Sequence, residues 1–195
     1  MESSTSPIHP LLASRWSPRA FADRDLDLET LGTLLQATRW SPSCYNDQPW
    51  SFVLARRDDD AYQNLLDCLV PQNRAWAATA PVLGLAVARL QFAHNGAPNR
   101  HAWYDLGLAV AQFIVQATAL GLCVHQMAGF DTDAARQHCK VPNGFDPAVV
   151  FALGYQGDPS RLPAGVTEKN PAERARRNVS EFVFAGRWGV PFVGL

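Results

Sequence analysis

The chain has 195 residues, of which 47% are hydrophobic and 18% are charged. This length and composition predict one globular domain, spanning residues 1–195, with an ample apolar core. The formal net charge of −1 argues against a general affinity for nucleic acids and other polyanions. Any phosphate group would have to be held by a few local basic residues.

The cysteines and the amino terminus both favour a cytoplasmic protein. None of the four cysteines forms a C-x-x-C pair. Residues 1–16 lack the basic start and the apolar centre of a secretory signal. Reduced thiols in the cytoplasm are therefore expected.

In chain order, the first half predicts an amino-terminal arm followed by interleaved helices and strands. Leucines at helical spacing follow Asp27, which can cap a helix that ends before Pro42. β-branched and aromatic residues after Pro49 predict a strand, and the apolar run after Pro81 fits a strand buried on both faces. The expected elements are an arm over 1–12, a helix over 28–40, a strand over 50–57, a helix over 58–70 capped by one of its first Asp residues, a short helix of ambiguous type over 72–80, and a strand over 81–90.

The second half is dominated by one long apolar helix, expected over about 102–121. The run 106–124 is about long enough to cross a bilayer, but it carries Gln112 and Gln116 on one helical face. A helix in the core or in a dimer interface is therefore preferred to a membrane span. The other expected elements are a short strand over 123–130, a helix over 131–140 capped by Asp131, a strand from 149 that ends at Gly154, and a polar segment leading into an apolar tail. This interleaving predicts a mixed α and β fold.

Common catalytic motifs do not occur in the sequence. The chain contains no G-x-G-x-x-G, no P-loop and no G-x-S-x-G. No Ser or Cys lies in a recognisable activating context. The metal-ligand candidates Cys123, His125, His138 and Cys139 match no strong zinc pattern, so no metal is expected.

Two clusters of basic residues could bind an anion. Arg15, Ser17 and Arg19 occupy alternate positions of an extended segment, so their side chains would project to one side and could grip a phosphate. They could equally be solvated charges on an exposed arm. The second cluster could complete a phosphate site or coat a surface; it consists of Arg174, Arg176 and Arg177.

A third polar cluster lies in the segment "WSPSCYNDQPWSF", residues 40–52. Asn46 and Gln48 could hydrogen-bond the edge of a planar heterocycle, with the neighbouring aromatic side chains as walls. The alternative is a tight connection from helix to strand whose Trp and Phe belong to the core.

In their order along the chain, these clusters resemble the nitroreductase family of FMN-dependent oxidoreductases. The segment 15–21, R-W-S-P-R-A-F, is similar to the family's R-x-S-x-[RK]-x-F, and 42–50, P-S-C-Y-N-D-Q-P-W, to its P-S-x-x-N-x-Q-P-W. The other similar segments, which carry the resemblance over nearly the whole chain, are 73–74 with 80–81, the helix 107–121, 128–131, 153–155 and the terminal Arg cluster. Two departures stand out: Cys44-Tyr45 is bulkier than usual, and Asn178-Val179 stands where a Pro is frequent.

The resemblance implies an α+β fold, with a central, mostly antiparallel sheet flanked by helices. It implies a homodimer in which the apolar tail 182–195 packs on the partner, and in which Gln112 and Gln116 lie in the interface. FMN would be bound at the interface, with NAD(P)H as electron donor. A small flat molecule, such as a nitroaromatic or a quinone, would accept the electrons in a ping-pong cycle; no nucleic-acid or membrane partner is implied. Two alternatives are open: a related FMN enzyme for dehalogenation or flavin destruction, and a non-catalytic flavin-binding dimer.

The resemblance also implies roles for individual residues. The flavin N5 would carry the chemistry, so no catalytic side chain is expected. The 43–49 loop would lie against the ring, Gly129 would face N5, and Asn73 and Arg74 would reach in from the partner subunit. A cation at Arg19 or Arg74 would stabilise the reduced flavin. The expected cofactor-binding residues are Arg15, Trp16, Ser17, Arg19, Ser43, Asn46, Gln48, Pro49, Asn73, Arg74, Ala128, Gly129, Arg174 and Arg176.

The segment 91–103 joins the second predicted strand to the long helix, and it has few residues compared with the family pattern. It could cover the flavin ring and shape the substrate pocket, or it could be a solvent loop. The candidate substrate contacts within it are His94, Asn95 and Trp103.

Overall fold

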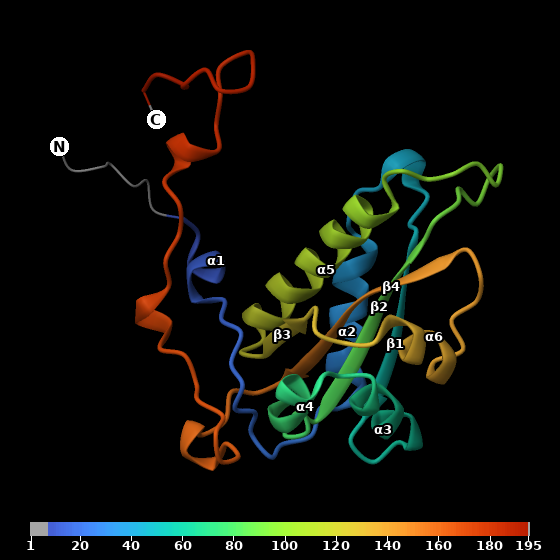
Figure 1. Ribbon diagram of the computed structural model, residues 1–195, viewed down its shortest axis with the longest axis vertical. Helices are drawn as coiled ribbons and strands as arrows, with labels where there is room; N and C mark the ends of the chain where they lie inside the picture. The colour runs from blue at the N-terminus through green and yellow to red at the C-terminus, as the bar shows by residue number, and fades with distance from the viewer. Residues whose placement is uncertain (1–7, 195) are drawn as a thin grey trace.

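A four-stranded antiparallel sheet forms the centre of the computed structural model, which describes residues 8–194 (Figure 1). Its strand order is β1-β2-β4-β3, so β2 and β4 are central and β1 and β3 are the edges. The strands are β1 (Trp50–Arg56), β2 (Val82–Arg89), β3 (Cys123–Met127) and β4 (Phe145–Gly154). The expected α+β fold with an antiparallel sheet is confirmed.

Helices cover both faces of this sheet (Figure 1). On one face pack α2 (Leu28–Arg39) and α5 (Ala102–Ala119). On the other face pack α3 (Asp60–Asp67), α4 (Pro71–Ala77) and α6 (Thr132–His138). Each face therefore has its own apolar core, and the sheet separates the two.

Side chains of β2 supply both cores. Leu83 and Leu85 belong to the core beneath α3 and α4, whereas Val82 and Ala86 belong to the core beneath α5, and all four are buried. Successive side chains of a strand point to opposite faces. The continuous apolar run in the sequence is therefore explained by burial on both sides.

Two of the expected helix caps are present. The carboxylate of Asp27 accepts a hydrogen bond from the N–H of Thr30 at 2.6 Å and starts α2. The carboxylate of Asp131 accepts bonds from the N–H groups of Asp133 and Ala134, each at 2.9 Å, and starts α6. These side chains satisfy amides that have no partner inside the helix.

Three boundaries differ from the sequence predictions. A short helix, α1 (Pro10–Ser14), forms in the segment predicted as a loose arm, because Pro is well placed in a first helical turn; residues 1–7 of that arm lie outside the described residues. Strand β4 begins at Phe145 instead of residue 149, and its Pro147 is accommodated where the register shifts between Ala86 and Val87. The N-cap residue of α3 is Asp59, one of the predicted Asp residues, but its carboxylate makes no cap bond and accepts from the N–H of Arg56 instead.

The predicted long helix is α5. Its Leu106 and Phe113 are buried, Gln112 is exposed and Gln116 is half-buried. In residues 8–194 no helix combines the length and the apolar character needed to cross a membrane. The placement of the two Gln residues in a dimer interface stays a prediction.

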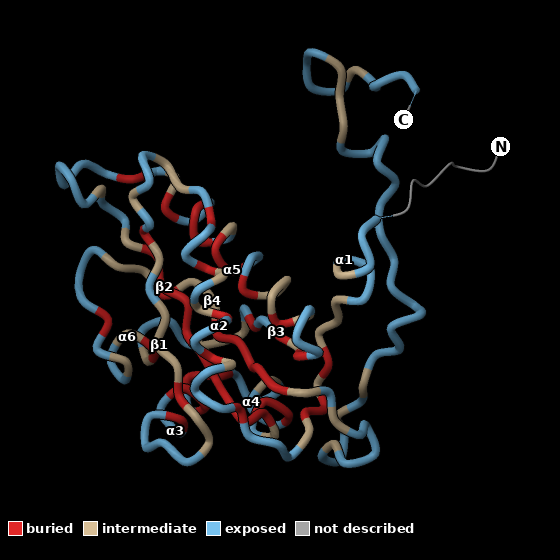
Figure 2. Tube along the Cα trace, turned by 180° about the vertical axis from the view of Figure 1, so that it is seen from behind, coloured by how far each residue is buried: buried red, intermediate tan, exposed pale blue. Residues whose placement is uncertain are grey.

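The carboxy-terminal segment leaves the body of the chain (Figures 1 and 2). Beyond the 3-10 turns η2 (Pro159–Arg161), η3 (Pro171–Glu173) and η4 (Val179–Glu181), it contains no further helix up to residue 194. Its Trp188 and Val193 are 90% and 92% exposed. Apolar side chains of this size are unusual in an exposed stretch; the packing of this tail on a partner subunit stays a prediction.

Two glycines give a matched test of the packing. A Cβ on Gly84 would lie 2.2 Å from Cζ of Phe151, which fills the core beneath α5, whereas a Cβ on Gly32 of α2 would meet nothing within 4 Å. We expect Gly84→Ala to lower the free energy of unfolding by about 1–3 kcal/mol through overpacking. We expect Gly32→Ala to raise it by up to about 1 kcal/mol through helix propensity. Urea denaturation of the two variants checks both signs; an unchanged Gly84→Ala protein would contradict the packing.

Candidate functional site

The amino-terminal Arg-Ser segment and the carboxy-terminal Arg residues meet beside β3. Nη1 of Arg15 donates to Oγ of Ser17 at 2.8 Å, and this hydroxyl lies 3.4 Å from the carbonyl oxygen of Val124 in β3. The guanidinium of Arg174 donates to the carbonyl oxygens of Arg15 (2.8 Å) and Ala13 (2.9 Å). Two segments that are distant in the sequence are thus joined.

Positive charge accumulates here without an acidic partner. Burial, together with the charges of Arg176 and Arg174, lowers the pKa of Arg15. The four ion pairs within residues 8–194 involve Arg57, Arg74, Arg89 and Arg136, and none involves this arginine cluster, defined as Arg15, Arg174 and Arg176. Such a cluster favours a bound anion with several acceptor oxygens, such as a phosphate.

A buried donor beside the cluster also lacks a partner. Trp16 lines a cavity of about 640 Å³ together with Arg174, whose guanidinium lies 5.7 Å from the centre of the Trp16 ring. Nε1 of Trp16 is buried and makes no hydrogen bond within the described chain. Leaving such a donor unpaired costs about 1–3 kcal/mol. Glu168 and Glu173 also line this cavity, but neither forms an ion pair with the arginine cluster. The cluster and the free donor beside it therefore fit an anionic ligand rich in acceptors.

Glu168 fixes the carboxy-terminal segment over this site. One oxygen of its carboxylate accepts from the N–H groups of Arg19 (2.6 Å) and Ala20 (2.9 Å). The side chain of Arg19 reaches past it to the carbonyl oxygen of Thr167 at 2.9 Å. The Arg19 guanidinium is therefore bonded to the segment 158–175, unlike the guanidinium of Arg15.

Asn73 and Gly129 form a second group in the same chain. Nδ2 of Asn73 donates to the carbonyl oxygen of Gly129 at 3.0 Å, and the N–H of Val70 donates to the same oxygen at 3.1 Å. A Cβ on Gly129 would lie 2.8 Å from Nδ2 of Asn73, so glycine is required here. Arg74 forms an ion pair with Asp67 at 2.7 Å.

This contact corrects one expectation from the sequence. The resemblance implies that Asn73 and Gly129 reach the flavin from different subunits. In the structure, the two residues are hydrogen-bonded within one chain. Asn73 and Gly129 meet because Leu69 and Phe130 form a β-bridge that brings the start of α4 against the segment after β3.

This Asn73–Gly129 group also lies near the arginine cluster. Val124 contacts Ser17, and β3 ends at Met127, about 10 Å further along the strand.

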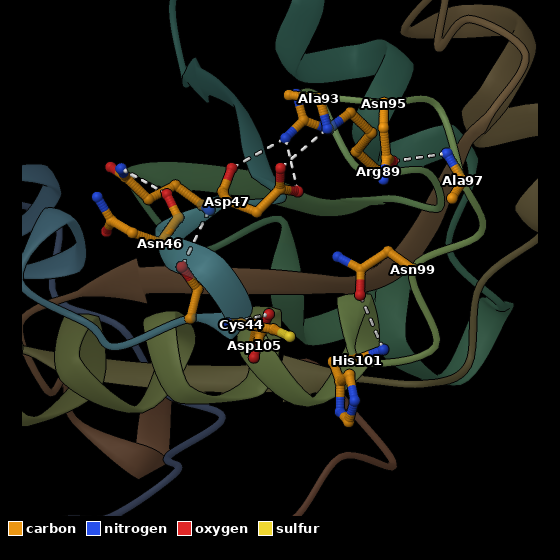
Figure 3. A network of polar contacts seen from close by, with 12 residues as sticks. Cys44, Asn46, Asp47, Arg89, Ala93, Asn95, Ala97, Asn99, His101 and Asp105 are labelled. Carbon is orange, nitrogen blue, oxygen red and sulfur yellow. Dashed lines mark hydrogen bonds and ion pairs between the residues drawn. The ribbon is translucent and has the colours of Figure 1, made fainter.

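The 43–49 loop forms a third group with an unusual backbone (Figure 3). Tyr45, Asn46 and Gln48 have φ values of 55°, 54° and 49°, in the left-handed region that residues with a side chain rarely adopt. Each such residue costs on the order of 1 kcal/mol. The N–H of Cys44 donates to the buried carboxylate of Asp105 at 3.0 Å, and the N–H of Gln48 donates to Oγ of Ser43 at 3.0 Å.

Asp47 ties this loop to the end of β2 and to the segment that follows it (Figure 3). Its side chain is only 2% exposed, and its carboxylate accepts from Nη2 of Arg89 (2.8 Å) and from the N–H of Ala93 (2.9 Å). Burial alone would raise the pKa of Asp47, but the bonds from Ala93 and Arg89 outweigh it and lower the pKa. The carbonyl oxygen of Pro49 accepts from the N–H of Arg89 at 2.7 Å.

The three candidate substrate residues do not share one site. His94 lines a cavity of about 450 Å³ with Tyr45 and Asn46. Asn95 instead accepts from the N–H of Ala97 at 2.9 Å and closes a local turn. Trp103 lines a separate apolar cavity of about 320 Å³ along α5.

The sheet keeps the 43–49 loop away from the arginine cluster. The loop precedes Trp50, which pairs with Ala88 at one end of the sheet. Val124 lies at the other end, where it pairs with Leu153. The length of β1 separates the two ends by about 20 Å, and β1 and β3 are opposite edges. One chain therefore does not bring Asn46 and the arginine cluster together.

The cysteine and histidine candidates form neither a metal site nor an activated thiol. Residues 8–194 hold no group of three His, Cys, Asp or Glu side chains able to bind a metal ion. Nδ1 of His125 instead lies 2.7 Å from the carbonyl oxygen of Pro18. Burial raises the pKa of Cys68 to about 11 and also raises the pKa of Cys123 and of Cys139, which disfavours their thiolates.

Sequence reasoning missed two residues that hold the 43–49 loop: Asp47 and Arg89. Asp47 and Arg89 are 42 positions apart, so no local spacing connects them. The available signal was an acidic residue inside the 42–50 motif and a basic residue at the end of the next predicted strand.

With this geometry in hand, comparison with known proteins defines the family. The model of the Nitroreductase family matches residues 12–155. An uncharacterised 15.4 kDa protein of Mycolicibacterium smegmatis is 38% identical over 148 residues, which cover 72% of this chain and 98% of that protein. The chain belongs to the nitroreductase family.

Solved structures and a second relative agree with this assignment. The crystal structure of an oxidoreductase containing FMN matches with a TM-score of 0.87 and 33% identity, and covers 96% of each chain. A provisionally named nitroreductase from Desulfovibrio desulfuricans, crystallised in complex with FMN, shares the fold with a TM-score of 0.71 and 21% identity, over 93% of this chain and 99% of that one. A Ralstonia nicotianae protein, provisionally named NADH dehydrogenase/NAD(P)H nitroreductase, is 26% identical over 159 residues, covering 72% of this chain and 80% of its own.

The anchoring role of Glu168 leads to a test in solution. We expect Glu168→Ala to raise the hydrogen-exchange rate of the Arg19 and Ala20 amides roughly tenfold or more, because each loses a bond to a charged acceptor. Glu173→Ala is the matched control, since Glu173 accepts only from the side chain of Asn170 and from no amide of the 15–20 segment. Equal exchange in the two variants would show that Glu168 does not hold the segment.

Proposed function

We propose that this chain is an FMN-dependent oxidoreductase that takes electrons from NAD(P)H and passes them to a small flat acceptor such as a nitroaromatic or a quinone. The arginine cluster without a counter-ion is the observation that carries the proposal, because the FMN phosphate bears about two negative charges. Related proteins add support: two of the similar structures contain FMN, and the Ralstonia relative has NAD(P)H nitroreductase in its provisional name.

In this proposal the arginine cluster holds the FMN phosphate. Nε1 of Trp16 supplies a further hydrogen-bond donor to the ribityl phosphate, and Ser17 orients the Arg15 guanidinium by accepting its hydrogen bond. Asn73, Ala128 and Gly129 face the ring, and Arg74 adds positive charge beside Asn73. When bound, FMN supplies the redox chemistry of a ping-pong cycle, so the chain itself needs to bind, orient and shield rather than to provide a nucleophile.

We further propose that a second copy of the chain completes each site. Asn46, with Ser43, Gln48 and Pro49, lies at the opposite end of the sheet from the arginine cluster, so these residues reach the ring from the partner. The exposed tail with Trp188 and Val193 supports such a homodimer, because it offers apolar surface that its own chain leaves uncovered. Each copy would be one FMN-binding domain over residues 1–195, and the four free cysteines favour the cytoplasm.

The visible spectrum of the purified protein tests the function. We expect oxidised-flavin absorbance that is bleached under anaerobic conditions by NADH or NADPH. A protein that is colourless and takes up no added FMN would contradict the proposal. Bound flavin that neither nucleotide bleaches would point instead to a non-catalytic flavin-binding dimer.

The phosphate assignment has its own variant. We expect Arg15→Ala combined with Arg176→Ala to weaken FMN binding by roughly 100-fold or more, since two charged hydrogen-bond donors are lost. Arg177→Ala is the comparison, because its guanidinium lies 5.6 Å from the Phe182 ring instead of in the cluster. Full FMN occupancy in the double variant would show that the phosphate is held elsewhere.

Mixed dimers test whether the site is shared between chains. We expect Asn46→Ala and Arg15→Ala homodimers each to bind FMN weakly. When the two are unfolded together and refolded, each mixed dimer should regain one unaltered site, because both substitutions then fall in the other site. Recovery of FMN binding near one site per mixed dimer is the expected result; no recovery would mean that one chain supplies both residues.

A further inference from the structure

Three aromatic rings gather at the exposed end of the 43–49 loop. The ring centres of Tyr45 and Phe92 are 5.8 Å apart, those of Tyr45 and His94 are 5.8 Å apart, and those of Phe92 and His94 are 5.4 Å apart. Tyr45 is 81% exposed although it contacts both other rings. We call Tyr45, Phe92 and His94 the aromatic platform; Tyr45 and His94 line the same cavity of about 450 Å³ as Asn46.

The two sides of the platform come from segments that are not continuous in the sequence. Tyr45 lies in the strained stretch of the 43–49 loop. Phe92 and His94 lie in a turn over 91–98 that is closed by a bridge between Gln91 and Pro98 and by a bond from the N–H of Phe92 to the carbonyl oxygen of Ala97 at 2.9 Å. Something must therefore hold the loop and the turn in register.

Asp47 makes that connection. One carboxylate oxygen accepts from the N–H of Ala93, the residue between Phe92 and His94, and the other accepts from Nη2 of Arg89. The same Nη2 also donates to the backbone carbonyl of Asp47 at 2.9 Å. The side chain of Asp47 is 2% exposed, so these bonds are shielded from water and from salt.

We propose that Asp47 is a positioning residue that holds the aromatic platform together, and that the platform binds the flat ring of the electron acceptor. The inference rests on the proposed function and deepens it, because it assigns the acceptor to a surface beside Asn46, one of the proposed flavin contacts. Exposed aromatic faces stack on flat electron-poor rings such as nitroaromatics and quinones. The strained backbone of Tyr45 and Asn46 is held in place by bonds to other elements, as is common at binding sites.

The test compares acceptor kinetics and cofactor binding in matched variants. We expect Asp47→Asn to raise KM for the quinone menadione about tenfold. Because Asp47 also holds the loop that carries Asn46 and Pro49, this variant is expected to weaken FMN binding as well. Tyr45→Leu should raise this KM by a similar factor, with kcat, the FMN dissociation constant and the rate of flavin reduction by NAD(P)H within about twofold of the unmodified protein, because the exposed Tyr45 ring holds no other part of the chain. Asp146→Asn is the control: it breaks an Arg–Asp pair of the same type, Arg136–Asp146, between α6 and β4.

Three results would overturn the proposal. Unchanged KM in both Asp47→Asn and Tyr45→Leu would remove the platform from acceptor binding. Loss of FMN from Asp47→Asn, with KM for menadione unchanged in Tyr45→Leu, would make Asp47 a cofactor residue. A rise in KM for Asp146→Asn as large as that for Asp47→Asn would show that the change in KM reflects lost stability of the fold and not loss of the platform.

Failure of the proposed function would be recognised separately. If the protein does not turn over NAD(P)H, menadione binding is followed by NMR on the ring resonances of Tyr45, Phe92 and His94. Shifts of these resonances on addition of menadione, with a dissociation constant that Asp47→Asn raises about tenfold, support the platform without any turnover. Absence of such shifts in the unmodified protein would contradict it.

Discussion

The two central strands, β2 and β4, set the distance between the arginine cluster and the 43–49 loop, and the proposed site depends on this distance. Both are buried on both faces, and Gly84 lets the ring of Phe151 cross over β2 without a clash. The resulting sheet is a rigid spacer, because a close-packed core does not deform continuously. It carries the arginine cluster at one end and the 43–49 loop at the other, on opposite edges. In the proposed dimer each chain therefore contributes two half-sites, and the exposed apolar side chains of the tail offer surface for the contact between copies.

Both proposed half-sites consist of loops that are held by a few polar bonds to neighbouring segments. At one end, Arg174 and Glu168 bond to backbone groups of the 13–20 segment and fix the carboxy-terminal segment over it. At the other end, Asp47 and Asp105 hold a backbone with three left-handed residues. Backbone strain of this kind persists only where surrounding bonds over-determine it. The anchors are therefore as important to the site as the side chains that face a ligand.

Much of the fold follows from local sequence patterns. The continuous apolar run of β2 predicted a strand, the cap residues Asp27 and Asp131 predicted two helix starts, and the order of the polar clusters predicted the family. Local patterns do not encode which residues come into contact when they are far apart in the sequence. The bond between Asp47 and Arg89, the contact of Asn73 with Gly129, and the separation of His94 from Trp103 depend on how the sheet assembles. The early start of β4 was hidden because Pro147 is tolerated only next to a register shift in its partner strand.

The central claim is that an uncompensated arginine cluster binds the phosphate of FMN. Titration of the flavin-free protein with FMN and with riboflavin, followed by flavin fluorescence, tests it most directly, because the two ligands differ only in the phosphate. Two charge-assisted bonds of about 1.5–3 kcal/mol each predict that FMN binds roughly 100-fold or more tightly than riboflavin. The difference should shrink as salt is added. Equal affinities for the two flavins would contradict the assignment of Arg15, Arg174 and Arg176.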